Sequence, residues 1–151
     1  MTWIISYCLL NFKDNSGKFI YSYSEVYSQG SYYLSSVADE VFLYPTGMLD
    51  FRGLGSELMF FKGALDKLGV EMQIIRGSNN KFKSAVEPFI YKQMSDANRE
   101  QMMTILNSLW GNMLTNIKSS RNISIEKMNE IADSIQVRNA QSAVDYQLVD
   151  Q

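Results

Sequence analysis

The sequence predicts an α/β fold in which a largely parallel sheet is followed by an all-helical region. Segments rich in aromatic and β-branched residues alternate with segments whose apolar residues recur every three or four positions, an order typical of βαβ units. Beyond residue 92 only the helical spacing remains, which divides the 151 residues into an α/β portion, 1–92, and a helical portion, 93–151. A hydrophobic fraction of 46% and a charged fraction of 20% are those of a globular domain with a real core.

The chain opens with a helix and a strand–helix–strand unit. The apolar residues 1–10 predict the end of a buried amphipathic helix, which Gly17 closes at a C-cap position. Residues 18–24 predict the first strand, residues 32–38 show helical spacing, and residues 40–44 predict the second strand. The order of these elements predicts a parallel pair of strands with a helical crossover.

A second series of the same kind is expected next. Residues 48–51 predict a short third strand. The helix predicted at 57–68 has Ser56 as its N-cap and Gly69 at its C-terminal end, and a strand is predicted at 70–75. The repeated order extends the parallel sheet.

Three helices are predicted in the remainder of the chain. The long helix at 95–119 starts at a serine and carries acidic residues in its first turn. Ser124 caps a second helix at 125–132, and residues 139–146 predict a short last one.

Composition excludes several kinds of chemistry. The chain has no histidine and a single cysteine, Cys8, so a Ser-His-Asp triad, a histidine zinc site, a disulfide framework and a thiolate cluster are all impossible within it. We therefore expect no metal and no cofactor. A net charge of −2 with dispersed basic residues argues against binding to nucleic acid. The apolar start lacks a basic region and a cleavage site and, at about ten residues, is too short to span a bilayer.

A polar loop with two lysines is the first candidate site. Lys81 lies near Lys83, and Phe82 and Phe89 could form apolar walls around them. A lysine acts as a general base only in its neutral form, which desolvation or a neighbouring cation favours. The alternative is a solvated loop with ordinary surface lysines. Composition alone favours that alternative, and so does Glu87, because a nearby carboxylate holds a lysine protonated.

The corner from Ser28 to Ser31, between a strand and a helix, is the second candidate. A nucleophilic serine or an oxyanion hole of backbone N–H groups could lie there. A serine needs an activating base, however, so a tight turn with helix caps is the preferred interpretation. Packing and burial at an interface likewise explain the seven nearby aromatic residues better than a stacking platform does: Phe19, Tyr21, Tyr23, Tyr27, Tyr32, Tyr33 and Phe42.

Four segments carry a resemblance to a known family. They are residues 82–90 (Phe-Lys-Ser-Ala-Val-Glu-Pro-Phe-Ile), 94–100, 27–40 and 60–70. Together they resemble the N-terminal repeat of the long, two-repeat form of the signal peptide peptidase A (protease IV) family, peptidase family S49. The likeness extends from Lys13 to Asp150, and the Lys-Ser-Ala-Val-Glu-Pro-Phe run is highly specific.

The resemblance implies a fold, an activity and a site. The fold is a ClpP/crotonase-like βαβ repeat with a helical C-terminal extension, here truncated at its N-terminus. The activity is cleavage of signal peptides by a Ser–Lys dyad, which places the general base at Lys83. The family also implies a homo-oligomer, a tetramer, located in the bacterial cytoplasmic membrane with its catalytic part facing the periplasm.

The chain departs from the family pattern in two ways. In the long form the nucleophilic serine lies in a C-terminal repeat that is absent here, and alignment through Tyr32 and Tyr33 places Gln29 at the position of the short form's nucleophile. The expected transmembrane helix and early strands are also missing. The chain is thus expected to supply a base and to be inactive alone. The alternatives are a non-catalytic assembly module of the same fold and, less favoured, a crotonase-type acyl-CoA enzyme.

Overall fold

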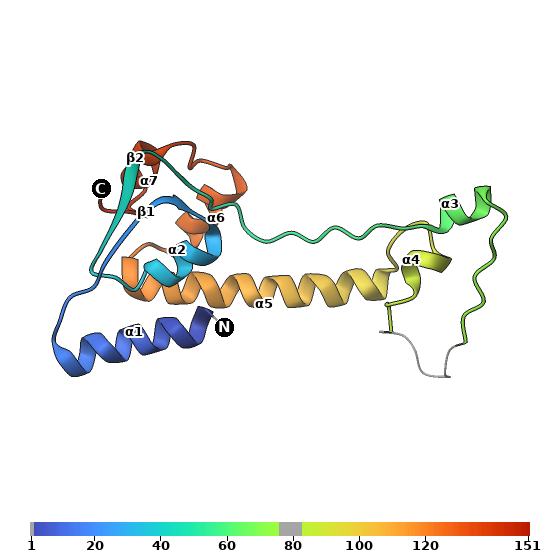
Figure 1. The fold of residues 1–151 in the computed structure, drawn as a ribbon, viewed down its shortest axis with the longest axis horizontal. Coiled ribbons are helices and arrows are strands. Elements are labelled where there is room, and N and C mark those ends of the chain that lie inside the picture. The colour runs from blue at the N-terminus through green and yellow to red at the C-terminus, as the bar shows by residue number, and fades with distance from the viewer. Residues whose placement is uncertain (1, 76–82) are drawn as a thin grey trace. The chain divides into compact units, whose positions relative to one another are not determined.

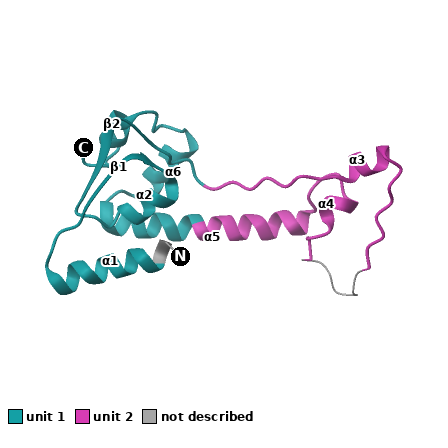
Figure 2. Ribbon diagram, viewed as in Figure 1, with its two compact units in different colours: residues 1–53, 110–151 teal, residues 54–109 magenta. Residues whose placement is uncertain are grey.

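The structure is a computed structural model that describes residues 2–75 and 83–151 (Figure 1). The chain forms two compact units, one of residues 1–53 and 110–151 and the other of residues 54–109 (Figure 2). Helix α5 (Asp96–Arg121) belongs to the second unit up to Leu109 and to the first from Trp110 onward. A mixed α/β architecture with a small parallel sheet and a helical C-terminal region confirms the coarse prediction of the fold class.

Helix α1 (Thr2–Ser16) opens the first unit and ends where Gly17 adopts a left-handed φ of 62°, as predicted. The prediction that this helix is buried is wrong. Ile4, Tyr7 and Phe12 are 46–64% exposed. Apolar residues occur around the whole helix, so one packed face cannot cover them all. None of the helices in the described parts of the chain is both long enough and apolar enough to cross a bilayer.

Strand β1 (Tyr21–Tyr27), helix α2 (Gln29–Ser35) and strand β2 (Glu40–Leu49) form one βαβ unit, in which the two strands are parallel. The two short strands predicted at 40–44 and 48–51 are wrong as separate elements, because β2 runs through both Pro45 and Gly47. A Cβ atom on Gly47 would lie 2.5 Å from the backbone oxygen of Glu25. Glycine is therefore required where the two strands approach each other this closely.

A single core joins these strands to the C-terminal helices. Val41 and Leu49 of β2 are buried together with Leu114 and Ile117 of α5. Helices α6 (Ile125–Asp133) and α7 (Ala140–Asp145) complete the core with their own apolar faces, which include Met128, Ile131 and Ala143. The cap predicted at Ser124 is confirmed, because its hydroxyl accepts from the backbone N–H of Lys127. Helix α7 begins with a capping box between Asn139 and Ser142.

The aromatic residues divide into two groups. Tyr27, Tyr32 and Tyr33 are buried, which confirms the prediction of packing, and Tyr32 donates a 2.7 Å hydrogen bond to the backbone oxygen of Leu148. Phe19, Tyr21 and Tyr23 are 56–70% exposed in this chain. Along β1 the tyrosines Tyr21 and Tyr23 face outward, whereas the serines between and after them are half-buried.

The second unit contains helix α3 (Lys62–Lys67), helix α4 (Glu87–Ile90) and the start of α5. The helix predicted from residue 57 with Ser56 as its cap is wrong: α3 begins five residues later, without a side-chain cap. Gly69 ends the turn with a φ of 68°, as predicted. The strand predicted at 70–75 is also wrong. A strand needs a partner, and no other strand is present in the part of this unit that the structure describes.

An ion pair between Arg121 and Asp150 joins the end of α5 to the C-terminal residues. An oxygen of Asp150 lies 2.9 Å from the Arg121 guanidinium and 2.7 Å from the backbone N–H of Val41. Burial acts to raise the pKa of Asp150, but the hydrogen bonds from Arg121 and Val41 outweigh it and hold this pKa below the usual value.

This ion pair predicts an acid-sensitive contribution to stability. Because the folded protein lowers the pKa of Asp150, the contribution is present above the unfolded value of about 3.9 and disappears as pH falls through the folded value. Solvent screens a carboxylate that is 38% exposed, so we expect a loss on the order of 1 kcal/mol. Urea unfolding against pH should show this loss in wild type and in the exposed control Asp133→Asn. Asp150→Asn should lack it, and an unchanged acid limb in that variant would contradict the assignment.

Candidate active site around Lys83

Lys83 lies in the second unit at the start of a compact turn, and it is exposed. The other predicted lysine, Lys81, and the predicted wall Phe82 lie outside the described residues, as does the loop at 76–80. The turn that follows Lys83 is closed by a 2.9 Å hydrogen bond from the backbone N–H of Glu87 to the oxygen of Ser84. Lys83 therefore directly precedes the hydrogen-bonded turn from Ser84 to Glu87.

Helix α4 continues the turn without a break. The N–H of Phe89 donates to the oxygen of Val86 at 3.1 Å, and the N–H of Tyr91 donates to the oxygen of Glu87 at 2.9 Å. Pro88 occupies the first turn of the helix, where its fixed φ is favourable and its missing N–H costs nothing. The Glu-Pro-Phe step that is unusual in the sequence is thus a helix start.

Glu87 anchors this segment to the beginning of α5. Its side chain is buried, with 4% exposed. One carboxylate oxygen accepts a 2.5 Å hydrogen bond from the hydroxyl of Ser95, and the other accepts from the N–H of Ser95 at 3.2 Å and from the amide of Asn98 at 2.9 Å. The Ser95 hydroxyl also accepts from the backbone N–H of Asn98, which makes it the cap of α5. A carboxylate at this place is stabilised by the partial positive charge of the helix start.

Phe89 fixes the opposite side of the segment. Its ring stacks on that of Phe61, with centroids 5.7 Å apart and planes at 20°, and the N–H of Phe61 donates to the oxygen of Pro88 at 2.7 Å. Phe89 was predicted as an apolar wall beside the lysines; its described ring contact is with Phe61. The segment after Lys83 is therefore held by the residues before α3 and by α5.

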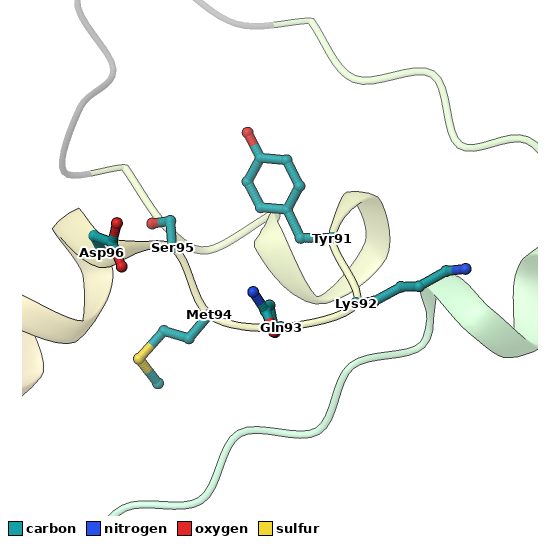
Figure 3. Close-up of a pocket in the computed structure, with 6 residues that line it drawn as sticks. All are labelled: Tyr91, Lys92, Gln93, Met94, Ser95 and Asp96. Carbon is teal, nitrogen blue, oxygen red and sulfur yellow. The ribbon is translucent and has the colours of Figure 1, made fainter.

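A hollow of about 380 Å³ lies along the loop from Tyr91 to Asp96, which joins α4 to α5 (Figure 3). Figure 3 shows that its six lining side chains come from consecutive residues. Lys92 lies 3.9 Å from Asp66, and the Ser95 hydroxyl is bonded to Glu87. The Lys92 and Ser95 side chains thus each contact a carboxylate. Across the described residues, His, Cys, Asp and Glu side chains do not gather in threes that could hold a metal.

The corner at Ser28–Ser31 belongs to the first unit and is structural. The Ser28 hydroxyl accepts from the N–H of Ser31 as the N-cap of α2, and the Ser31 hydroxyl donates back to the oxygen of Ser28 at 2.9 Å. The preferred interpretation, a tight turn with helix caps, is confirmed.

Gln29 has a role that sequence reasoning missed. Its side-chain oxygen accepts from the N–H groups of Arg52 and Gly53, both at 3.0 Å, and its amide donates to the oxygen of Gly53 at 2.9 Å. Gln29 therefore ties α2 to the chain that follows β2. No local pattern in the sequence indicates these contacts, because their partners lie 23 and 24 residues away.

The chain is an α/β protein with a parallel βαβ unit and with a lysine at the start of a hydrogen-bonded turn. A family model described as peptidase family S49 matches residues 12–151. The chain belongs to this family.

Three relatives show how much of a family member the chain represents. It is 41% identical over 118 residues to Protease 4 of Haemophilus influenzae, an alignment that covers 78% of this chain and 19% of the relative. It is 38% identical over 153 residues to Protease 4 of Salmonella typhi, covering 97% and 24%. It is 32% identical over 112 residues to the chloroplastic serine protease SPPA of Arabidopsis thaliana, covering 74% and 16%. The chain spans less than a quarter of the length of these relatives.

Proposed function

We propose that this chain contributes the general base, Lys83, to a Ser–Lys dyad that cleaves peptides. The observation that carries the proposal is the run at 82–90, which places a lysine within the region that matches the S49 family. A chain without histidine is consistent with a peptidase whose base is lysine. The relatives are named as proteases, which supports the same reaction class.

The proposed mechanism is general-base catalysis of acyl transfer. The neutral ε-amine of Lys83 takes the proton of a serine hydroxyl, and the serine oxygen attacks the peptide carbonyl. Backbone N–H groups stabilise the oxyanion, and the proton passes from Lys83 to the departing amine as the peptide C–N bond breaks. Water activated by the same amine then hydrolyses the ester.

The serine in this proposal comes from outside the 151 residues. Ser28 and Ser31 cap a helix, and Gln29 occupies the aligned nucleophile position with all three of its described hydrogen bonds directed to backbone atoms. Because Lys83 is exposed here, the segment that brings the serine would also supply the desolvation that a neutral lysine needs.

The remaining features follow from the family and are part of the same proposal. The chain is most of the N-terminal repeat of the long, two-repeat form, and its β1–α2–β2 unit is a portion of a ClpP/crotonase-like repeat. The substrates are cleaved signal peptides, the protein acts at the bacterial cytoplasmic membrane facing the periplasm, and it assembles as a homo-oligomer. The parallel βαβ unit is consistent with the proposed fold, and the 19–24% coverage of two bacterial relatives is consistent with this chain being one part of a longer protein.

The test compares the full-length gene product with residues 1–151 alone. We expect the full-length protein to cleave peptides and to react with a serine-directed phosphonate at one serine outside residues 1–151. The isolated chain should do neither, and Ser28→Ala in the full-length protein should leave the rate unchanged. Labelling of Ser28 or Ser31, or peptidase activity of the isolated chain, would contradict the proposal. An active relative assayed in parallel shows that the substrate is suitable.

A second candidate is a non-catalytic assembly module, which the exposed side chains of Phe19, Tyr21 and Tyr23 favour. The two candidates differ in what the surrounding gene encodes. A downstream repeat with a serine before a Tyr-Tyr-like helix start supports the peptidase. Its absence would favour assembly.

A further inference from the structure

We propose that Glu87 is a positioning residue, whose buried carboxylate holds Lys83 in place by binding the start of α5. This inference rests on the proposed function, because it assigns Glu87 a part in the chemistry of Lys83. It depends on contacts within the second unit alone, between the turn after Lys83, helix α4 and the first turn of α5.

Removal of the Glu87 carboxylate would leave hydrogen-bond donors of Ser95 and Asn98 without their acceptor. Three donors from Ser95 and Asn98 converge on its two oxygens, and both Glu87 and Asn98 are at least 96% buried. An ionised acceptor makes stronger hydrogen bonds than a neutral one. A glutamine at this position replaces one oxygen by a donor, which faces the donors already there.

Glu87 lies only four residues after Lys83 and is connected to it through a single hydrogen-bonded turn. Glu87 also closes the preceding turn with its own N–H, which donates to the oxygen of Ser84, the residue directly after Lys83. The side chain and the main chain of one residue thus join the lysine's turn to a helix of 26 residues. A side chain on a fixed turn loses less freedom when it meets its partner, and misplacement by about 1 Å can cost on the order of 10²-fold in rate.

The carboxylate oxygens of Glu87 bind groups at the start of α5. Its described hydrogen bonds go to the cap and the first turn of α5, and Lys83 itself is exposed. Figure 3 shows Ser95 at the junction between the loop and the helix. The charge of Glu87 therefore has a structural partner of its own at the helix start.

The experiment uses the full-length protein with Glu87→Gln and Ser95→Ala, and with Glu100→Gln as the matched control. Glu100 lies in the same helix and is exposed. We expect Glu87→Gln to lower kcat about 10- to 100-fold with little change in KM, and to move the midpoint of the pH–rate profile upward, because a displaced lysine is more solvated. Ser95→Ala should act in the same direction and more weakly. Glu100→Gln should match wild type.

The outcomes separate this inference from the proposed function. If Lys83→Ala retains activity, the proposed function fails and this inference fails with it. If Lys83→Ala is inactive and Glu87→Gln keeps the wild-type kcat and pH profile, only the positioning role fails. If Glu87→Gln loses the same fraction of kcat at every pH, the loss reflects a smaller amount of folded enzyme, and the positioning role also fails. Should Glu87→Gln not fold, the pH profile of Ser95→Ala decides in the same way.

Discussion

Replacing Lys83 by alanine should lower kcat/KM for peptide hydrolysis by about 10²–10⁴-fold in the full-length protein, the usual contribution of a general base. Without the ε-amine, the serine must lose its proton to water as it attacks. The matched control is Lys67→Ala, another exposed lysine of the same unit, which should leave the rate unchanged. A peptidase assay at saturating and subsaturating substrate separates this effect from weaker binding.

The variant Lys83→Arg distinguishes a general base at position 83 from a residue that contributes only positive charge. Arginine keeps the positive charge and the length of the side chain, but it does not give up its proton in proteins and so cannot accept one. We expect Lys83→Arg to be as inactive as Lys83→Ala. An active arginine variant would show that position 83 contributes charge and not a base.

Replacing Ile117 by alanine should lower the free energy of unfolding by about 2–5 kcal/mol, because it removes three buried carbon atoms and leaves a cavity. Ile117 is fully buried in the core that joins α5 to β2, α6 and α7. Urea unfolding followed by circular dichroism measures the change. Ile105→Ala is the matched control, since Ile105 lies on the same helix with 46% of its surface exposed. Equal losses in the two variants would contradict this assignment of the core.

Local signals in the sequence predicted most of the helix ends and the parallel strand pair. Ser124 and Gly17 act within one turn of their own positions, so their roles can be inferred from neighbouring residues. The strand predicted at 70–75 is wrong for the opposite reason. Its β-branched residues have a high propensity for strands, but a strand forms only where it can pair with another strand.

The candidate site could be predicted only in part. The lysine at position 83 is found through its resemblance to a family motif, because a single exposed lysine has no distinctive pattern of its own. The role of Glu87 depends on Ser95 and Asn98, eight and eleven residues away across a loop, and that of Gln29 depends on Arg52 and Gly53. The fold determines such contacts, so they cannot be predicted from residue types and their spacing in the sequence.

The central claim is that Lys83 activates a serine supplied from outside this chain, and the rate of serine modification tests it most directly. A serine-directed fluorophosphonate reports deprotonation of the nucleophile without depending on peptide binding. We predict that the full-length protein is modified at one serine outside residues 1–151, at a rate that rises with pH in wild type and in Lys67→Ala. Lys83→Ala should be modified at least about 10²-fold more slowly. Equal rates in wild type and Lys83→Ala, or modification of a serine within residues 1–151, would contradict the claim.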